Sequence, residues 1–142
     1  ALELGRRLPL ETPNERPSIH CPQDSANLVL HEMSILEQEE LWVLLLDIRN
    51  RLIRMHKLYR GSVNQSQIRI AELFKEAIRD NASSIVVLHN HPSGDPTPSP
   101  DDIAVTKKII EAGTNLDIQV LDHLIIGGYR YISLKERGLA FG

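Results

Sequence analysis

Two short apolar runs limit the fold more than any other feature of the sequence. LWVLLL occupies residues 41–46, and IVVL occupies residues 85–88. The second run is short, β-branched and bounded by polar residues, which is typical of a strand buried on both faces rather than of a helix. The first is followed by the turn-like DIRNR and by residues 52–59, where apolar and polar residues partly alternate. Together those segments predict a β-hairpin.

The segments before and after these strands have apolar residues at helical spacing, with plausible start and stop residues. It predicts helices over residues 26–35, 65–80 and 99–112, the last of them ended by Gly113. A second hairpin, joined by two glycines, is predicted for residues 118–126 and 129–134. The order of helix, two strands, helix, strand, helix and two strands predicts an α/β (α+β) fold in which a mixed β-sheet is flanked by helices.

Composition excludes several classes of protein. At 142 residues the chain has the size of one domain, and its 42% hydrophobic and 25% charged residues are close to a soluble average. No apolar run approaches the roughly 20 residues that span a bilayer, and the N-terminus has no secretory pattern. With Cys21 alone, no internal disulfide is expected, and the cytoplasm is the default location. A net charge of −3 gives no general attraction to nucleic acid.

The stretch HNHPSGDPTPSPDD, residues 89–102, directly follows the second apolar run. If the strand extends to residue 91, His89 and His91 point to the same side and can share one ion. Two histidines alone are a weak signal, because a zinc site normally has a third protein ligand and, in catalysis, an open position for water. Asp102 can supply that third ligand, since the prolines of the loop stiffen its return toward the histidines.

The end of this stretch has two compatible interpretations. Ser99, Pro100 and Asp102 fit the start of a helix, as an N-cap, a proline at the first helical position and an acidic residue in the first turn. For SPDD alone, capping is the commoner explanation. Ser99 also lies one helical turn from Asp102, where its hydroxyl can hydrogen-bond a developing oxyanion or a metal-bound water. The two histidines upstream are what favour a hydrolytic centre.

The spacing of these residues resembles a family signature. His-x-His, seven residues, Ser, two residues and Asp, present here as His89, His91, Ser99 and Asp102, is similar to the signature of JAMM (MPN+) metallopeptidases. More narrowly, QEELWVLLLDIRNRL, YRGS, HNHPSGDPTPSPDD and LDHLIIG resemble the bacterial RadC family in the same order. The resemblance extends from about residue 18 to the C-terminus.

The resemblance implies a JAMM/MPN-type fold, similar to the cytidine deaminase-like architecture. It also implies Zn²⁺ held by His89, His91 and Asp102, with water at the fourth position and Ser99 assisting at the oxyanion. The expected reaction is hydrolysis of an amide bond, peptide or isopeptide, in a peptide or protein substrate.

The family pattern further implies a catalytic glutamate just before the first central strand. Glu39 matches that position, and the glutamate would take a proton from the zinc-bound water and pass it to the leaving amine. Glu40 stays open as the alternative, because strand side chains alternate and a shift of one residue exchanges the two.

Two other functions remain as alternatives. RadC-like proteins carry a DNA-repair label, and in that family a helical region normally precedes this domain; ALELGRR resembles its last residues. Residues 1–17 are therefore expected to be a linker and the end of that region, and residues 18–142 the JAMM/MPN domain. Nucleic acid would then be contacted only through the preceding region. A non-catalytic MPN interaction module is the other alternative, and the complete set of ligands argues against it.

Three further residues have plain interpretations. His31 opens HEMSI, which lacks the second histidine of the HExxH zinc motif and is predicted to lie on a helix surface. Trp42, inside the first apolar run, is predicted to be a core residue. His123, in LDHL, could lie near the site, but a hydrogen-bonded structural histidine is the favoured interpretation.

Overall fold

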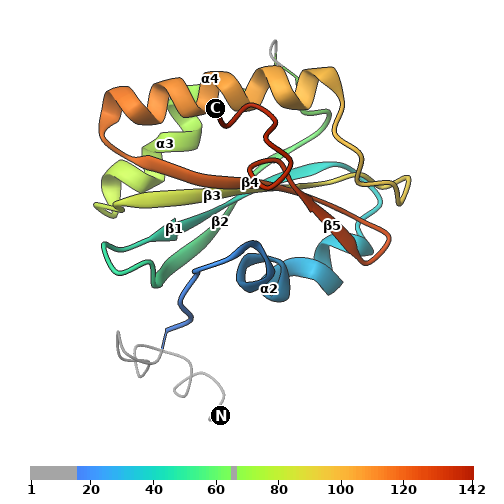
Figure 1. The fold of residues 1–142 in the computed structure, drawn as a ribbon, viewed down its shortest axis with the longest axis horizontal. Coiled ribbons are helices and arrows are strands. Elements are labelled where there is room, and N and C mark those ends of the chain that lie inside the picture. The colour runs from blue at the N-terminus through green and yellow to red at the C-terminus, as the bar shows by residue number, and fades with distance from the viewer. Residues whose placement is uncertain (1–15, 65–66) are drawn as a thin grey trace.

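The structure is a computed structural model that describes residues 16–64 and 67–142. Five strands form one mixed sheet in the order β2-β1-β3-β4-β5. In Figure 1, α3 and α4 cover one face of this sheet and α2 covers the other. The elements in chain order are α2 (Pro22–Ser34), β1 (Glu40–Leu46), β2 (Leu52–Arg60), α3 (Ile70–Arg79), β3 (Ser84–Asn90), α4 (Pro100–Leu116), β4 (Gln119–Gly127) and β5 (Arg130–Ser133). The predicted fold class and element order are confirmed.

The two central strands divide the core between the two faces of the sheet. β1 is antiparallel to both β2 and β3, whereas β3 is parallel to β4 and is joined to it through α4. Odd-numbered residues such as Leu41 and Val87 pack under α3 and α4, and even-numbered residues such as Trp42 and Leu88 pack against α2. Both faces are covered, which is why the sequence of these strands is continuously apolar. Trp42 is confirmed as a core residue.

Gly113 does not end α4, contrary to the prediction. The helix continues to Leu116 and ends at Asp117, whose backbone is left-handed with φ of 61°. A Cβ on Gly113 would lie 2.5 Å from the carbonyl oxygen of Ile118 and 2.9 Å from Cγ2 of Val120. The glycine therefore allows α4 to pack closely against the start of β4, a requirement that sequence alone does not separate from a helix stop.

Three other boundaries differ from the prediction. β3 extends to Asn90, beyond the apolar run. Of the helix predicted over residues 65–80, the structure shows Ile70 to Arg79 as helical; residues 65 and 66 lie outside the described residues. The helix predicted from residue 26 begins at Pro22, a residue whose fixed φ suits the first helical turn.

The N-terminal part of the described chain runs beside the β1–β2 turn. Ser18 forms an antiparallel bridge with Arg51, and the amide of Ile19 donates to the Asn50 carbonyl at 2.8 Å. Most of the linker predicted over residues 1–17 falls on residues 1–15, which lie outside the described residues. In the described part of the chain, no helix combines the length and the apolar character needed to cross a bilayer.

Candidate metal centre

The side chains of His89 and His91 converge at the C-terminal end of β3. His89 is completely buried and belongs to the odd-numbered set, so it points toward α4. His91 follows the last strand residue, yet its amide donates to the Ile126 carbonyl of β4 at 2.8 Å, which continues the strand geometry by one residue. The two Nε2 atoms are 3.1 Å apart. The expectation that both rings face one point holds, although β3 itself ends at Asn90.

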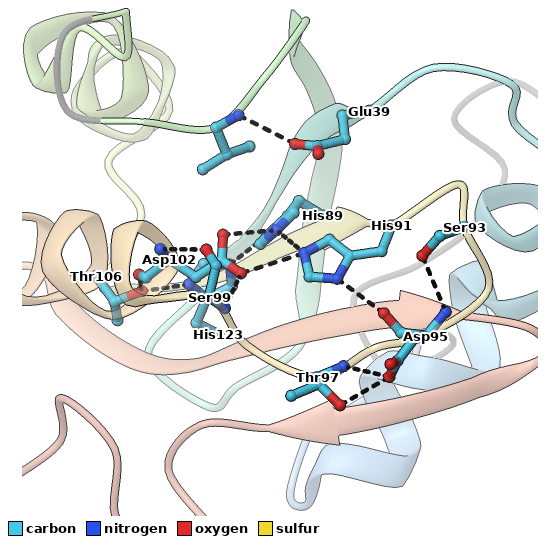
Figure 2. A network of polar contacts seen from close by, with 11 residues as sticks. Glu39, His89, His91, Ser93, Asp95, Thr97, Ser99, Asp102, Thr106 and His123 are labelled. Atoms are coloured by element: carbon cyan, nitrogen blue, oxygen red, sulfur yellow. Dashed lines mark hydrogen bonds and ion pairs between the residues drawn. The ribbon is translucent and has the colours of Figure 1, made fainter.

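Asp102 reaches the histidines from the first turn of α4. Its Oδ1 lies 3.1 Å from Nε2 of His89, and its Oδ2 lies 3.2 Å from Nε2 of His91. A capping box fixes this carboxylate: the Ser99 amide donates to Oδ2 at 2.8 Å, and the Asp102 amide donates to the Ser99 hydroxyl oxygen at 3.0 Å. The predicted helix start is therefore present, and it is the same structure that presents Asp102 to the histidines (Figure 2).

The outward nitrogens of both rings have partners of their own. Nδ1 of His91 donates to the Asp95 carbonyl at 2.9 Å, so a neutral His91 ring has its lone pair on Nε2. Nδ1 of His89 lies 2.8 Å from Nε2 of His123. His123 is thus the buried, hydrogen-bonded histidine that the sequence suggested, and it lies directly behind a candidate ligand.

The inward-facing atoms fit a metal ion. One ligand atom from each of His89, His91 and Asp102 lies within 4.8 Å of the others. Imidazole nitrogens and carboxylate oxygens are acceptors when the rings are neutral, so their convergence brings lone pairs together and is stabilised by a cation at the centre. Two imidazole nitrogens and a carboxylate oxygen are a donor set that divalent transition metals accept.

Electrostatics at the centre favour the carboxylate form of Asp102. Burial opposes that charge, but contacts with His89 and His91 and the hydrogen bond from the Ser99 amide outweigh it and hold the pKa of Asp102 well below its usual range. Burial lowers the pKa of His91, because it disfavours a charged ring. Contacts with Asp102 and the Asp95 carbonyl outweigh this effect and raise the pKa above its ordinary value.

The proline-rich loop after His91 packs against the turn between β4 and β5. A Cβ on Gly127 would lie 3.1 Å from both the carbonyl carbon of Gly94 and the nitrogen of Pro96, so a side chain there would push the loop back by a few tenths of an ångström. Arg130 donates from Nη2 to the Gly94 carbonyl at 3.1 Å. These contacts hold the loop whose Asp95 carbonyl orients the His91 ring.

Glu39 and Glu40 lie on opposite faces of the sheet. The Glu40 carboxylate accepts from the Trp42 indole at 2.9 Å and pairs with Arg60 at 3.5 Å, on the face that α2 covers. Glu39 comes just before β1 in the odd-numbered set, and its Oε1 accepts from the Val63 amide at 3.0 Å. Figure 2 shows Glu39 on the same side as His89 and His91. Alternation along β1 thus brings only Glu39 to the candidate centre.

Glu39 shares an open pocket of about 460 Å³ with three of the residues singled out in the sequence. The full lining is Glu39, Ser62, Val63, Asn64, His91, Pro92, Ser93, Ser99, Asp101 and Asp102. His89 is fully buried and is not one of the lining residues. The pocket therefore joins the glutamate, the serine and the exposed side of the ligand cluster in one volume that a substrate can enter.

Asn90 and Thr106 were not singled out in the sequence. The Asn90 side chain accepts from the Glu40 amide at 2.7 Å and donates to the Gln38 carbonyl at 3.0 Å, so it clamps the backbone on both sides of Glu39. The sequence does indicate the direction of this side chain, because a residue between the two histidines of an alternating strand points to the opposite face. Thr106 lies four residues after Asp102, and this spacing indicates that both residues lie on the same face of the helix.

A mixed five-stranded sheet with a His-His-Asp group at the end of its central strand defines a JAB-type domain. A family model described as "RadC-like JAB domain" matches residues 19–139, and the chain belongs to this RadC family. The family suggested by the sequence motifs is confirmed.

Relatives named "UPF0758 protein" support the same assignment. The chain is 58% identical to one from Roseiflexus castenholzii over 141 residues, which is 99% of this chain and 60% of the relative. It is 56% identical to one from Roseiflexus sp. over 142 residues, covering 100% of this chain and 61% of the relative. A Chloroflexus aurantiacus protein is 53% identical over 141 residues, 99% of this chain and 62% of that protein. The chain thus spans about three-fifths of the length of these relatives.

Proposed function

We propose that this domain is a zinc-dependent hydrolase that cleaves an amide bond, peptide or isopeptide, in a peptide or protein substrate. The observation that carries the proposal is the convergence of His89, His91 and Asp102 at the end of a buried strand, with Glu39 lining the same pocket as His91 and Asp102. Family membership supports the fold and the site, and the reaction is argued from these side chains.

Zinc is the metal that best suits this donor set. Two imidazole nitrogens and one carboxylate leave a tetrahedral ion with one open position, which is the arrangement of catalytic zinc sites. When bound, zinc would polarise the scissile carbonyl and lower the pKa of water at the open position to about 7. His89 and Asp102 would hold it from the buried side, and His91 from the side of the pocket.

Glu39 is the proposed general base and acid. Its carboxylate lines the pocket and is held at one oxygen by the Val63 amide, so it can accept a proton from the attacking water and return it to the leaving amine. The contacts of Glu40 with Trp42 and Arg60 on the other face of the sheet argue against this alternative.

Ser99 is the proposed oxyanion donor. Its oxygen already accepts the Asp102 amide, and this leaves the hydroxyl proton free to donate into the pocket. A donor of this kind stabilises charge that develops on the carbonyl oxygen during attack.

The pocket favours a protein substrate over nucleic acid. Its lining residues contribute carboxylates, hydroxyls and an amide side chain, with no lysine or arginine among the described residues that form it. Phosphate contacts normally come from such cations. A DNA-repair role would therefore need a surface outside this pocket.

Metal binding is tested first, by elemental analysis of the purified protein. The parent should hold about one equivalent of zinc, and the His89→Ala and Asp102→Ala variants should hold far less. A parent without bound zinc, also after incubation with zinc salt and desalting, would contradict the proposal.

Turnover is tested with a library of peptides and isopeptides. Glu39→Gln should lower the cleavage rate by roughly 10²–10⁴-fold with zinc still bound, because only the proton carrier is lost. Glu40→Gln is the matched control, since that neighbouring carboxylate faces away from the pocket, and it should cleave nearly as fast as the parent. Equal rates for Glu39→Gln and the parent would remove Glu39 as the base.

A further inference from the structure

We propose that Thr106 and His123 are positioning residues that fix the tautomer of His89, so that its Nε2 lone pair faces the metal position. The inference rests on the proposed metal site and adds two residues that would not touch the ion. They lie behind His89, on the side away from the pocket.

Three contacts link these residues in a chain. The Thr106 hydroxyl lies 2.6 Å from the backbone carbonyl oxygen of Asp102 and 2.5 Å from Nδ1 of His123. Nε2 of His123 lies 2.8 Å from Nδ1 of His89. Thr106 is 1% exposed and both histidines are completely buried, so water does not compete for these groups. Figure 2 shows Thr106, His123 and His89 in succession beside α4.

The hydrogen atoms in this chain follow from donor and acceptor chemistry. A carbonyl only accepts, so the Thr106 hydroxyl donates its one proton to Asp102. The Thr106 oxygen is then an acceptor, and Nδ1 of His123 must carry the proton that it receives. A neutral imidazole has one such proton, which leaves Nε2 of His123 as an acceptor. Nδ1 of His89 therefore donates to it.

The result is a lone pair on Nε2 of His89, the nitrogen that faces Asp102 and His91. The hydrogen-bond chain requires a neutral His123, and the complete burial of this ring disfavours a charge on it. A charged His123 would instead donate to His89 and move the His89 proton onto Nε2, where it would block a metal bond. Thr106 is the residue that sets this direction, because it accepts from Nδ1 of His123.

The hydrogen-bond chain begins and ends at the metal position, because Asp102 takes part at both ends. Asp102 offers its carboxylate to the metal position and, through its backbone carbonyl, orients Thr106. The partner behind His89 is a neutral imidazole, whereas ligating histidines often donate to a carboxylate. A neutral imidazole places no negative charge behind His89. The positive charge of a bound ion would then be less compensated, and the ion would polarise a substrate carbonyl more strongly.

Nuclear magnetic resonance of the metal-free protein tests the tautomers directly. Long-range proton–nitrogen spectra of histidine-labelled protein distinguish a proton on Nδ1 from one on Nε2. The parent should show Nδ1–H for both His89 and His123. Thr106→Val, which keeps the shape and removes the oxygen, should allow His123 to reverse and so mix the tautomers of His89.

Zinc titration of the same variants gives the second measurement. Thr106→Val should bind zinc about 10–100-fold more weakly, and Thr106→Ser, which restores the hydroxyl, should recover most of the affinity. Thr114→Val is the matched control: Thr114 also donates to the carbonyl four residues earlier in α4, at 3.0 Å, but is exposed and has no histidine partner. It should bind zinc as the parent does.

The possible results separate the two proposals. A parent with His89 protonated on Nε2, or a Thr106→Val variant with unchanged tautomers, would overturn the positioning role even if zinc binds. The derived tautomers in a protein that does not bind zinc would instead contradict the proposed function and leave the hydrogen-bond chain intact. Thermal unfolding of Thr106→Val and Thr106→Ser shows that the comparison is made on folded protein.

Discussion

The two candidate histidine ligands reach one point from different surroundings. His89 is the next-to-last residue of the buried strand β3, and its outward nitrogen meets an imidazole in the core. The His91 side chain is 15% exposed, and its outward nitrogen meets a carbonyl of a surface loop. Both rings are thereby oriented with Nε2 inward, one by packing and the other by a loop that a glycine turn holds. We therefore expect changes on the buried side to cost more stability, and more metal binding, than changes on the loop side.

The largest effect is expected at Asp102, on the buried side. Asp102→Ala removes the oxygens that face both histidines and the acceptor of the Ser99 amide, so it should abolish zinc binding and lower the free energy of unfolding by about 1–3 kcal/mol. Asp102→Asn also loses the charge but keeps an oxygen for the Ser99 amide. Urea unfolding of both metal-free variants should therefore find Asn more stable than Ala. Equal stability would show that the cap contributes nothing.

An intermediate effect is expected at Gly127, on the loop side. The Cβ of Gly127→Ala would press on Gly94 and Pro96 and shift the loop that orients His91. Zinc affinity should fall about 10-fold, with a loss of about 1 kcal/mol in stability. Calorimetric zinc titration and thermal unfolding measure the two effects. Gly142→Ala, where nothing lies within 4 Å of the added Cβ, is the control. An unchanged affinity for Gly127→Ala would break the comparison, because His91 would not depend on its loop.

The smallest effect is expected at Thr97, within the loop itself. The hydroxyl and amide of Thr97 both donate to the Asp95 carboxylate, at 2.7 and 3.0 Å, and these bonds hold the pKa of Asp95 below its ordinary value of 3.8. Because the folded pKa is depressed, the stabilisation is present above pH 3.8 and is lost as the pH falls through the folded value. Thr97→Val keeps the amide bond only, so the pKa should rise toward 3.8.

Carboxyl resonances of Asp95 followed against pH measure that change. The pKa of Asp47, which accepts from the backbone amides of Arg49 and Arg51 in the distant β1–β2 turn, is the internal reference and should be the same in both proteins. An unchanged pKa of Asp95 in Thr97→Val would mean that the amide alone stabilises the loop carboxylate.

Much of the architecture could be predicted because the patterns that encode it are local. Continuous apolar runs identified β1 and β3 since both of their faces are covered, and SPDD identified the start of α4 since a cap lies within four residues. The error at Gly113 had a non-local cause: the atoms that require a glycine there belong to Ile118 and Val120, beyond the end of the helix.

The site residues that lie close together in the sequence could be predicted from their spacing alone. His89, His91, Ser99 and Asp102 lie in one short stretch, and the structure brings them together. The choice between Glu39 and Glu40 depended on the register of β1, which only the pairing of Leu41 with His89 supplies. The contact of His123 with Thr106 joins β4 to α4, and no pattern within either segment contains it.

Asn90 links the two halves of the centre through a single backbone segment. Its neighbours on both sides point to the metal position, while its own side chain clamps the peptide groups around Glu39. The position of the candidate base relative to the ligands is therefore set by the pairing of β1 with β3 and by hydrogen bonds to the residue that lies between the two histidines. To graft this centre onto another sheet, a designer would have to include the start of β1 as well as the end of β3. The metal ligands alone would lack a correctly positioned glutamate.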